Sequence, residues 1–381
     1  MTDENQPGFR PPPYPYDRLD RLKPLAAGHE EGLVDLSIGT PCDPPPPEVV
    51  AALSASGTER GYPSSVGTPA FREAAAGWMR RRLGAEVPIA DIAACIGTKE
   101  LVTALPHWLR LRDPSRDTVL YPAVSYPSYA MGATLAGCRA VAVDLEGEGR
   151  GLDSVPPDDV ARALCLWVNS PGNPTGALTD LEAAAAWGRA HGVPVLSDEC
   201  YIEFTWHGPP RTILEHGVDG VLAVHSLSKR SNLAGLRAGF YTGDAELVHY
   251  LSEVRKHAGA MVPGPVQAAA VVAFGDDAHV DAQRERYAER MAFFRDVLAG
   301  AGAVAEPSAG SFYLWAAAPD GDAWGLTAWL AKWGGVLVAP GDLYGAAGEG
   351  YVRVALVQEM DRLRLVADRL RRAPEAGSAR A

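Results

Sequence analysis

The segment SLSKRSNLAGLRAG, Ser226 to Gly239, places a lysine among hydroxyl and small residues between two apolar stretches. Open α/β sheets bind ligands at strand ends of this kind. A single lysine is usually only a solvated charge, because lysines are rarely buried. Here Arg237 adds a planar cation suited to phosphate, and Ser226 and Ser228 add hydroxyl donors beside Lys229. Together these groups suit a phosphorylated aldehyde cofactor that would form a Schiff base with the lysine.

Three further segments place polar residues directly after expected strands. NSPGNPTG puts Asn173 in a turn where its amide can reach a ligand, although Asn-Pro is also ordinary turn chemistry. SDECY puts Asp198 at the carboxyl end of a strand, where it serves either a ligand or as the N-cap of a helix. CIGTKELVTAL runs from strand to helix through Gly97, Thr98 and Lys99. The first amides of that helix can bind an anion such as phosphate.

The elements that must position these residues form a βαβ pattern. Short apolar runs alternate with Ala-rich stretches, which predicts a parallel sheet with helices on both faces. We expect strands at Thr118–Tyr121, Arg139–Asp144, Leu164–Asn169, Val193–Ser197, Gly220–His225 and Arg237–Thr242. We expect helices at Phe71–Leu83, Glu100–Leu109, Leu181–His191 and Ala245–His257. A long helix over Asp281–Gly300, then GSFYLWA, a Trp-rich helix and YVRVALV, predict a separate α+β lobe.

Length and charge narrow the function classes. The 381 residues exceed one ordinary domain, so a large α/β unit with a smaller appendage is expected. A formal net charge of -12 argues against nucleic acid or an anionic membrane as the main partner. The 5 cysteines are scattered, so neither a disulfide framework nor a metal site is expected.

The N-terminal segment and the apolar runs bear on location. We find no signal peptide and no run of about 20 apolar residues, which predicts a cytoplasmic protein. Pro11, Pro12, Pro13 and Pro15 force an extended arm. Such an arm either packs on a partner subunit or is a loose tail, and the composition does not decide between them.

With these motifs the chain resembles the class I and II aminotransferases, which depend on pyridoxal 5′-phosphate (PLP) and have fold type I. The resemblance runs from about Tyr16 to Leu370, and the lysine signature SxSKxxxxxGxRxG is matched at every fixed position. It implies an α/β fold with a mostly parallel seven-stranded sheet in a large domain and a smaller α+β domain. The implied division is 1–45 as an arm and part of the small domain, 46–275 as the large PLP-binding domain, 276–372 as the small C-terminal domain and 373–381 as a flexible tail.

The resemblance also implies a role for each site residue. Lys229 holds PLP as a Schiff base and moves the proton, Asp198 pairs with the pyridine nitrogen, and Tyr201 and Asn173 bind the ring oxygen. Tyr126 stacks on the ring, and Arg353 with Gly39 binds the substrate, near Asn173. The phosphate is surrounded by Gly97, Thr98, Lys99, Ser226, Ser228 and Arg237. Tyr62 reaches the phosphate in the neighbouring subunit, which implies a homodimer with a shared site.

The implied activity is ping-pong transamination between an α-amino acid and a 2-oxo acid. The chain most resembles actinobacterial N-succinyldiaminopimelate aminotransferases, which implies N-succinyl-LL-2,6-diaminopimelate and 2-oxoglutarate as substrates. It departs from that group by having Ala104 for a Trp, Ala177 for an Arg, Ala316 and Ala317 for Thr-Arg, and VQE at Val357 to Glu359 for threonines. These losses of large and polar groups put the succinylated substrate in question.

Two other hypotheses therefore stay open. A PLP enzyme of secondary metabolism would use the same lysine for elimination, replacement or carbon–carbon bond formation at the β- or γ-carbon. A ligand sensor fused to a DNA-binding module is disfavoured, because about 30 residues before the enzyme body are too few for a helix-turn-helix domain. The acidic net charge also disfavours DNA.

Overall fold

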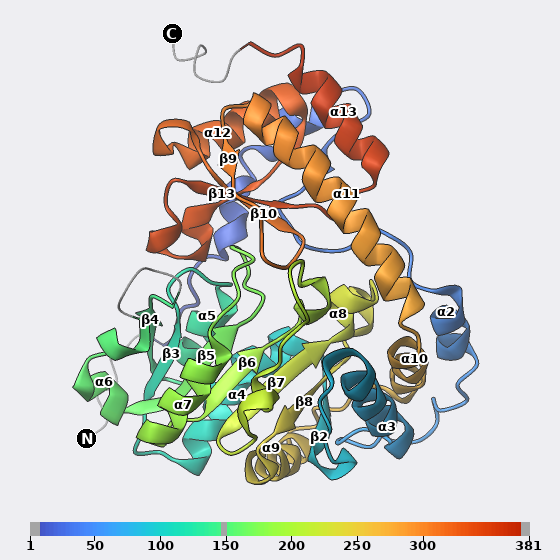
Figure 1. The fold of residues 1–381 in the computed structure, drawn as a ribbon, viewed down its shortest axis with the longest axis vertical. Helices are drawn as coiled ribbons and strands as arrows, with labels where there is room; N and C mark the ends of the chain where they lie inside the picture. Colours follow the sequence, from blue (N-terminus) through green and yellow to red (C-terminus); the bar gives the residue numbers. More distant parts are fainter. Residues whose placement is uncertain (1–7, 146–150, 375–381) are drawn as a thin grey trace.

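A seven-stranded sheet and a smaller four-stranded sheet, each with its own helices, make up the computed structural model, which describes residues 8–145 and 151–374 (Figure 1). The strands are β1 (Val34–Asp35), β2 (Ile92–Cys95), β3 (Thr118–Pro122), β4 (Arg139–Val143), β5 (Ala163–Asn169), β6 (Val195–Asp198), β7 (Val221–Ser226), β8 (Gly239–Gly243), β9 (Val304–Ala305), β10 (Tyr313–Ala317), β11 (Val336–Leu337), β12 (Ala339–Pro340) and β13 (Tyr351–Ala355). The helices are α1 (Lys23–Ala27), α2 (Pro47–Ser54), α3 (Pro69–Trp78), α4 (Thr98–Arg112), α5 (Ser128–Leu135), α6 (Pro157–Ala161), α7 (Leu181–His191), α8 (Leu227–Arg230), α9 (Ala245–His257), α10 (Gly264–Gly275), α11 (Ala278–Gly300), α12 (Ala323–Trp329) and α13 (Met360–Leu370).

The seven-stranded sheet has the order β2-β8-β7-β6-β5-β3-β4. The strands from β7 to β4 are parallel, whereas β8 is antiparallel to both β7 and β2. All six predicted strands are confirmed, with ends that differ by at most about two residues, as is normal for such assignments. The mostly parallel sheet is therefore confirmed, and the reversed direction of β8 is a feature that the sequence did not predict.

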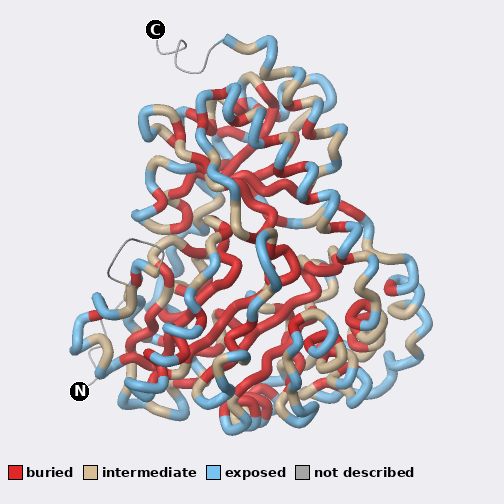
Figure 2. The backbone as a smooth tube through the Cα atoms, viewed as in Figure 1, coloured by how far each residue is buried: buried red, intermediate tan, exposed pale blue. Residues whose placement is uncertain are grey.

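Both faces of this sheet are buried, as Figure 2 shows by the continuous run of buried backbone through its strands. Side chains alternate between the faces with the period of two that a strand imposes. On β7, Leu222 and Val224 pack with α4, α5 and α9, while Val221 and Ala223 pack with α7 on the other face. This double burial explains why the strands read as continuous apolar runs.

The predicted helices are also confirmed, and two of them, α7 and α9, have the predicted bounds. Thr68 caps α3 by accepting a hydrogen bond from the Phe71 amide at 3.2 Å. The helix predicted to reach Leu83 is α-helical only to Trp78, and Met79–Leu83 continue it as a π-helical turn. Helices α5 and α10 were not predicted.

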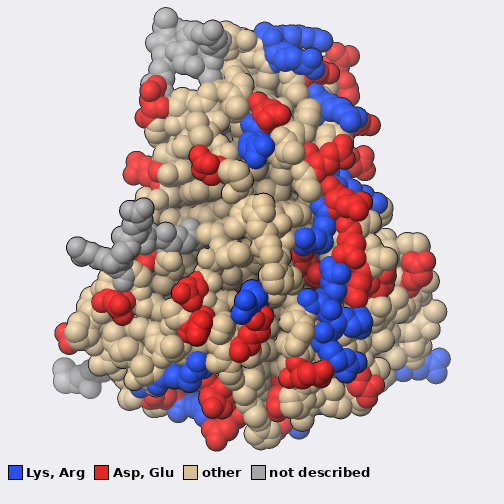
Figure 3. Space-filling model, viewed as in Figure 1, with Lys and Arg blue, Asp and Glu red and all other residues tan. Residues whose placement is uncertain are grey.

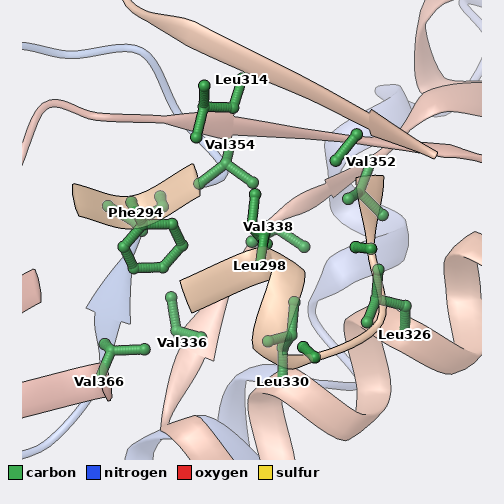
Figure 4. Close-up of a cluster of buried hydrophobic side chains, with 14 of the residues drawn as sticks. Phe294, Leu298, Leu314, Leu326, Leu330, Val336, Val338, Val352, Val354 and Val366 are labelled. Carbon is green, nitrogen blue, oxygen red and sulfur yellow. The ribbon is translucent and has the colours of Figure 1, made fainter. Parts of the chain in front are cut away.

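The smaller sheet is antiparallel, with the order β12-β13-β10-β9. Its core, drawn in Figure 4, joins Val352 and Val354 of β13 and Leu314 of β10 to Phe294 and Leu298 of α11. Strand β1 pairs with β11 beside this core, so the N-terminal segment lies with the smaller sheet. The α+β character predicted for residues after 281 fits this arrangement. The domain boundaries themselves stay a prediction, and residues 1–7 and 375–381 of the expected arm and tail lie outside the described residues.

Helix α11 runs along one side of the molecule, from the lobe of the smaller sheet to the helices that cover the large sheet (Figure 1). Its first turns carry ion pairs to the large-sheet side: Arg82 contacts Asp281 at 2.7 Å and the buried Glu203 at 3.0 Å, and Arg81 contacts Asp277 at 2.9 Å. Figure 3 shows acidic and basic side chains interspersed along this side of the molecule. These contacts fix the end of α11 next to the segment that follows β6.

Within residues 8–145 and 151–374, none of the helices combines the length and the apolar character that crossing a bilayer requires.

Candidate active site

A pocket of about 440 Å³ lies at the carboxyl ends of β5, β6 and β7, where the smaller sheet faces them. Twelve of the fourteen predicted site residues line it: Gly39, Thr98, Lys99, Tyr126, Asn173, Asp198, Tyr201, Ser226, Ser228, Lys229, Arg237 and Arg353. Gly97 lies directly behind the lining, because a Cβ added there would overlap the Arg237 guanidinium. Tyr62 lies elsewhere, with its side chain 100% exposed. The fold thus gathers residues that are up to 314 positions apart, from Gly39 to Arg353, around one cavity.

Lys229 sits on the short helix α8, directly after β7. Ser226 caps this helix by accepting a hydrogen bond from the Ser228 amide at 3.1 Å, and the Ser226 hydroxyl donates to the Ser228 hydroxyl at 2.9 Å. The Lys229 amine donates to the Gly39 carbonyl, across from the strand end. Burial lowers the pKa of Lys229 to about 8, because desolvation disfavours the ammonium form. A neutral amine, the form that attacks an aldehyde, is therefore accessible near neutral pH.

An anion cradle lies beside Lys229. It consists of the N-terminal end of α4, the Arg237 guanidinium and the Ser226 and Ser228 hydroxyls. Gly97 precedes α4 with φ 71°, a conformation that favours glycine, and the first amides of α4 lack partners within the helix. Arg237 has φ 57° and ψ 52°, an uncommon left-handed conformation for a non-glycine residue that brings its guanidinium against Gly97. Amides, hydroxyls and a planar cation in one place suit a phosphate group.

Asp198 ends β6 and is buried. Its carboxylate accepts hydrogen bonds from the Tyr129 hydroxyl at 3.0 Å and from the Cys200 amide at 3.2 Å. It makes no ion pair with a lysine or arginine in the part of the chain that the structure describes. The N-cap alternative is wrong, because the next helical turn begins after Tyr201 and has no side-chain cap. Burial raises the pKa of Asp198, so the site favours a cationic partner for this carboxylate.

Asn173, Tyr201 and Tyr313 link the two sheets across the pocket. The Asn173 amide nitrogen donates to the Tyr201 hydroxyl at 3.3 Å, and the Tyr201 and Tyr313 hydroxyls lie 2.8 Å apart. Asn173 itself is held by the Asn169 side chain, which accepts from its backbone amide at 2.8 Å. Burial holds the pKa of Tyr201 well above its usual range. Gly39 is required opposite them, because a Cβ there would overlap the Tyr313 hydroxyl.

Arg353 on β13 is only 2% exposed. One terminal nitrogen donates to the Asn173 side-chain oxygen at 3.0 Å, and the other donates to the Ser37 carbonyl. The guanidinium carbon lies 4.4 Å from the Tyr313 ring centroid and 4.9 Å from that of Tyr344. Its Nε is buried without a hydrogen-bond partner among the described residues. A buried cationic donor of this kind fits a carboxylate ligand.

The structure adds lining residues that motifs did not reveal, among them Tyr14, Tyr16, Tyr129, Asn169, Cys200 and Tyr313. Tyr129 could have been found from its position three residues after Tyr126, on the helix that follows β3. Tyr14 and Tyr16 belong to the proline-rich arm, which lies against this chain's own pocket: Tyr14 contacts the Tyr126 hydroxyl at 3.2 Å.

The positions that had put the succinylated substrate in question do not line the pocket. Ala104, Ala177, Ala316, Ala317 and Val357–Glu359 are all absent from its lining. Ala316 lies in the core of the smaller sheet instead. These departures are therefore weaker evidence about the substrate than the sequence suggested.

The chain is similar to proteins that are named as aminotransferases or transaminases. The family described as aminotransferase class I and II matches residues 31–370. The chain is 46% identical to 4-dedimethylamino-4-oxo-anhydrotetracycline transaminase OxyQ of Streptomyces rimosus, over 94% of this chain and 99% of that protein. It is 44% identical to the probable aminotransferase Rv1178 of Mycobacterium tuberculosis, over 94% and 85% of the two chains. It superposes on the probable N-succinyldiaminopimelate aminotransferase of Thermus thermophilus with a TM-score of 0.84, at 32% identity and over 94% and 99% of the chains.

Proposed function

The chain belongs to the class I and II aminotransferase family and has the fold type I architecture, and we propose that its pocket binds PLP at Lys229. The residues present fit this cofactor in three respects. The anion cradle suits the phosphate, the buried Asp198 suits a protonated pyridine nitrogen, and Lys229 offers an amine whose pKa is lowered to about 8. When bound, PLP supplies an electron sink for the negative charge that develops at the substrate α-carbon.

Proton transfer, stabilisation of the ring charge and binding of the ring are proposed for different residues of the chain. Lys229 would hold the cofactor and, as a neutral amine, would accept and return the proton of the substrate α-carbon. Asp198 would stabilise a protonated pyridine nitrogen, since its carboxylate is buried and forms no ion pair with a lysine or arginine among the described residues. Tyr201 and Asn173, which hydrogen-bond to each other at 3.3 Å, would hold the ring oxygen of the cofactor, and Tyr126 would pack on the ring.

The surroundings of Arg353 support an amino-acid substrate. Its unpartnered Nε and its position between Asn173 and the Tyr313 ring suit the α-carboxylate that amino acids and 2-oxo acids share. We propose that this contact, with Gly39 at the same wall, orients the α-carbon toward Lys229, whose amine contacts the Gly39 carbonyl.

For the physiological pair we propose N-succinyl-LL-2,6-diaminopimelate and 2-oxoglutarate. The likeness to the Thermus thermophilus protein supports this choice. A second candidate, amino transfer to a ring ketone in secondary metabolism, is supported by the 46% identity to the tetracycline transaminase and by the tyrosines at the pocket's outer end. Elimination or replacement chemistry at the same lysine stays the alternative to transfer.

We further propose a homodimer that shares its sites. The wholly exposed Tyr62 would then contact the phosphate in the partner subunit. On this proposal Tyr62→Phe weakens PLP binding, whereas Tyr351→Phe, which also removes an exposed hydroxyl, leaves it unchanged. Sedimentation at several protein concentrations measures the dimer directly.

The test of the function is a panel of substrates. The purified protein, loaded with PLP, is incubated with 2-oxoglutarate and each of several amino donors, including N-succinyl-LL-2,6-diaminopimelate, and glutamate is measured. Glutamate formed with the diaminopimelate donor in preference to L-alanine supports the first candidate. In a second set of incubations L-glutamate is the donor and a cyclic ketone is the acceptor, and glutamate consumed only there supports the second candidate. Loss of the donor's side chain without glutamate indicates elimination or replacement and contradicts both.

A further inference from the structure

The N-terminal arm forms one wall of the pocket. The Tyr14 hydroxyl lies 3.2 Å from that of Tyr126, and the Lys99 amine donates to Tyr14 at 3.4 Å. The Tyr16 hydroxyl donates to Tyr344 at 2.7 Å, and the Tyr14 and Tyr16 rings stack at 5.5 Å. Tyr14 is still 45% exposed, so its packing alone does not fix its place.

Three contacts outside the pocket hold the arm. Arg18 forms an ion pair with Asp342 at 2.9 Å. The guanidinium groups of Arg18 and Arg21 each lie 4.6 Å from the Trp324 ring centroid. The Trp324 indole in turn donates to Asp342 at 3.2 Å. We call Arg18, Arg21, Trp324 and Asp342 the arm clamp.

The arm clamp is anchored in the smaller sheet's lobe. Trp324 belongs to α12, and Asp342 precedes Tyr344, which receives the Tyr16 hydroxyl and also lies against Arg353. Leu19 and Leu22 of the arm are buried with Leu343 and Tyr344. Figure 1 shows the blue N-terminal segment against the orange and red elements of this lobe. The clamp and the proposed carboxylate site therefore belong to one packed unit.

We propose that the arm clamp is a positioning device for substrate selection: it holds Tyr14 and Tyr16 where they contact whatever extends beyond the α-amino-acid part of a substrate. The inference rests on the proposed aminotransferase function. A short substrate such as L-alanine would fill the space between Arg353 and Lys229, where it meets the Tyr16 ring, 6.0 Å from the Arg353 guanidinium carbon, but does not extend to Tyr14. A longer one would extend past Tyr16 toward Tyr14, whose hydroxyl lies 3.2 Å from that of Tyr126, so its binding would depend on where the clamp places the two tyrosine rings.

The predicted effect follows from the exposure of the clamp. The Arg18 and Asp342 side chains are 51% and 28% exposed, so the ion pair and the two cation–π contacts are individually weak. Losing both arginines should loosen the end of the arm that carries Tyr14 and Tyr16 without unfolding the protein, because Leu19 and Leu22 stay buried against the smaller sheet's lobe. We expect the KM for a long substrate to rise about fivefold to tenfold.

The experiment compares the parent with Arg18→Ala/Arg21→Ala, with Arg18→Lys/Arg21→Lys, and with Arg112→Ala as a matched control. Arg112 also joins an ion pair, with Glu246 at 3.3 Å, and lies 5.4 Å from the Tyr250 ring, but it does not line the pocket. Half-reactions are run with N-succinyl-LL-2,6-diaminopimelate and L-alanine. Amide hydrogen exchange of residues 12–22 is measured on each protein without cofactor, which follows the arm independently of catalysis.

We expect the double Ala variant to exchange faster in the arm and to raise KM for the long donor only, with kcat nearly unchanged. The double Lys variant should restore most of the affinity, and Arg112→Ala should alter neither donor. Equal changes for both donors, unchanged exchange in the arm, or a parent that binds the long donor no better than L-alanine each overturn the inference. Absence of amino transfer with every donor overturns the proposed function instead. The hydrogen-exchange data would still show whether Arg18 and Arg21 hold the arm in place.

Discussion

The two ends of the pocket are built differently. At the cofactor end, Asp198, Lys229 and Arg237 stand at or beside the ends of neighbouring strands of one sheet, which position their backbones, and contacts such as Asp198 to Tyr129 and Lys229 to Gly39 add to that frame. At the substrate end, Arg353 and the tyrosines come from the arm and the smaller sheet, and contacts between distant residues hold them. A rigid local frame suits chemistry that is the same for every substrate. A wall assembled from several elements allows selectivity to change without disturbing that frame.

The largest expected effect lies at the cofactor end. Lys229→Ala removes both the amine that binds the cofactor and the group that moves the proton, so kcat should fall by about 10⁴ or more. Borohydride reduction followed by mass spectrometry should find PLP covalently attached to the parent protein and not to the variant. An adduct that survives in Lys229→Ala would refute the assignment of this lysine.

Asp198→Ala should lower kcat by about 10²–10³, because the charge that stabilises the pyridinium in a buried site is lost. Glu199→Gln is the matched control. Glu199 is adjacent and equally buried, but it accepts from the Ile213 amide at 2.9 Å and does not line the pocket. Similar losses in both variants would mean that burial of any acid here matters, rather than the position of Asp198.

Arg353→Ala tests the substrate end and should lower kcat/KM for every amino acid by about 10²–10³, the value of a charged hydrogen-bonded contact. The dissociation constant of PLP should change far less, by about fivefold at most, because Arg353 contacts no residue of the anion cradle and meets the cofactor end only through its hydrogen bond to Asn173. Arg353→Lys keeps the charge and loses the planar fork, so we expect it to recover only part of the activity. A parallel loss of PLP affinity would show that the two ends are not separable.

The pH dependence of cofactor loading follows from the lowered pKa of Lys229. Below pH 8 the amine is mainly protonated, so PLP uptake by the apoenzyme should rise about tenfold per pH unit from pH ~6 and level off above pH ~8. If the pKa of Lys229 were not lowered, the rate of PLP uptake would keep rising up to the usual lysine pKa near 10.5. Stopped-flow absorbance measures the uptake, and a rise that continues to pH ~10 would contradict the burial effect.

The cofactor end of the pocket could be predicted from the sequence more fully than the substrate end. Lys229, Asp198, Asn173 and Gly97 follow apolar runs directly, and the carboxyl ends of parallel strands meet at one edge, so local motifs located them. Tyr14 and Tyr313 are far apart in sequence, and an aromatic residue is more often part of a core, so no local pattern singled them out.

Two features of the fold were missed for similar physical reasons. Helix α10 is apolar on all sides, so its sequence shows no helical period that could separate it from a strand. The antiparallel direction of β8 depends on how the chain returns through the Lys229 loop, and the composition of a strand buried on both faces does not reveal its direction.

The smallest effect concerns the hydrogen bond that joins the two ends. The Tyr201 and Tyr313 hydroxyls lie 2.8 Å apart in a buried position, one after β6 and the other on β10. In a double-mutant cycle with Tyr201→Phe and Tyr313→Phe we expect a coupling free energy in kcat/KM of about 0.5–1.5 kcal/mol, the net value of one hydrogen bond. Tyr201→Phe alone should also weaken PLP binding, whereas Tyr313→Phe should act on the amino acid only. Zero coupling would mean that the ends act independently. Coupling in the PLP affinity as well would mean that the smaller sheet helps to hold the cofactor. Tyr313 would then belong to the cofactor end of the pocket together with Tyr201.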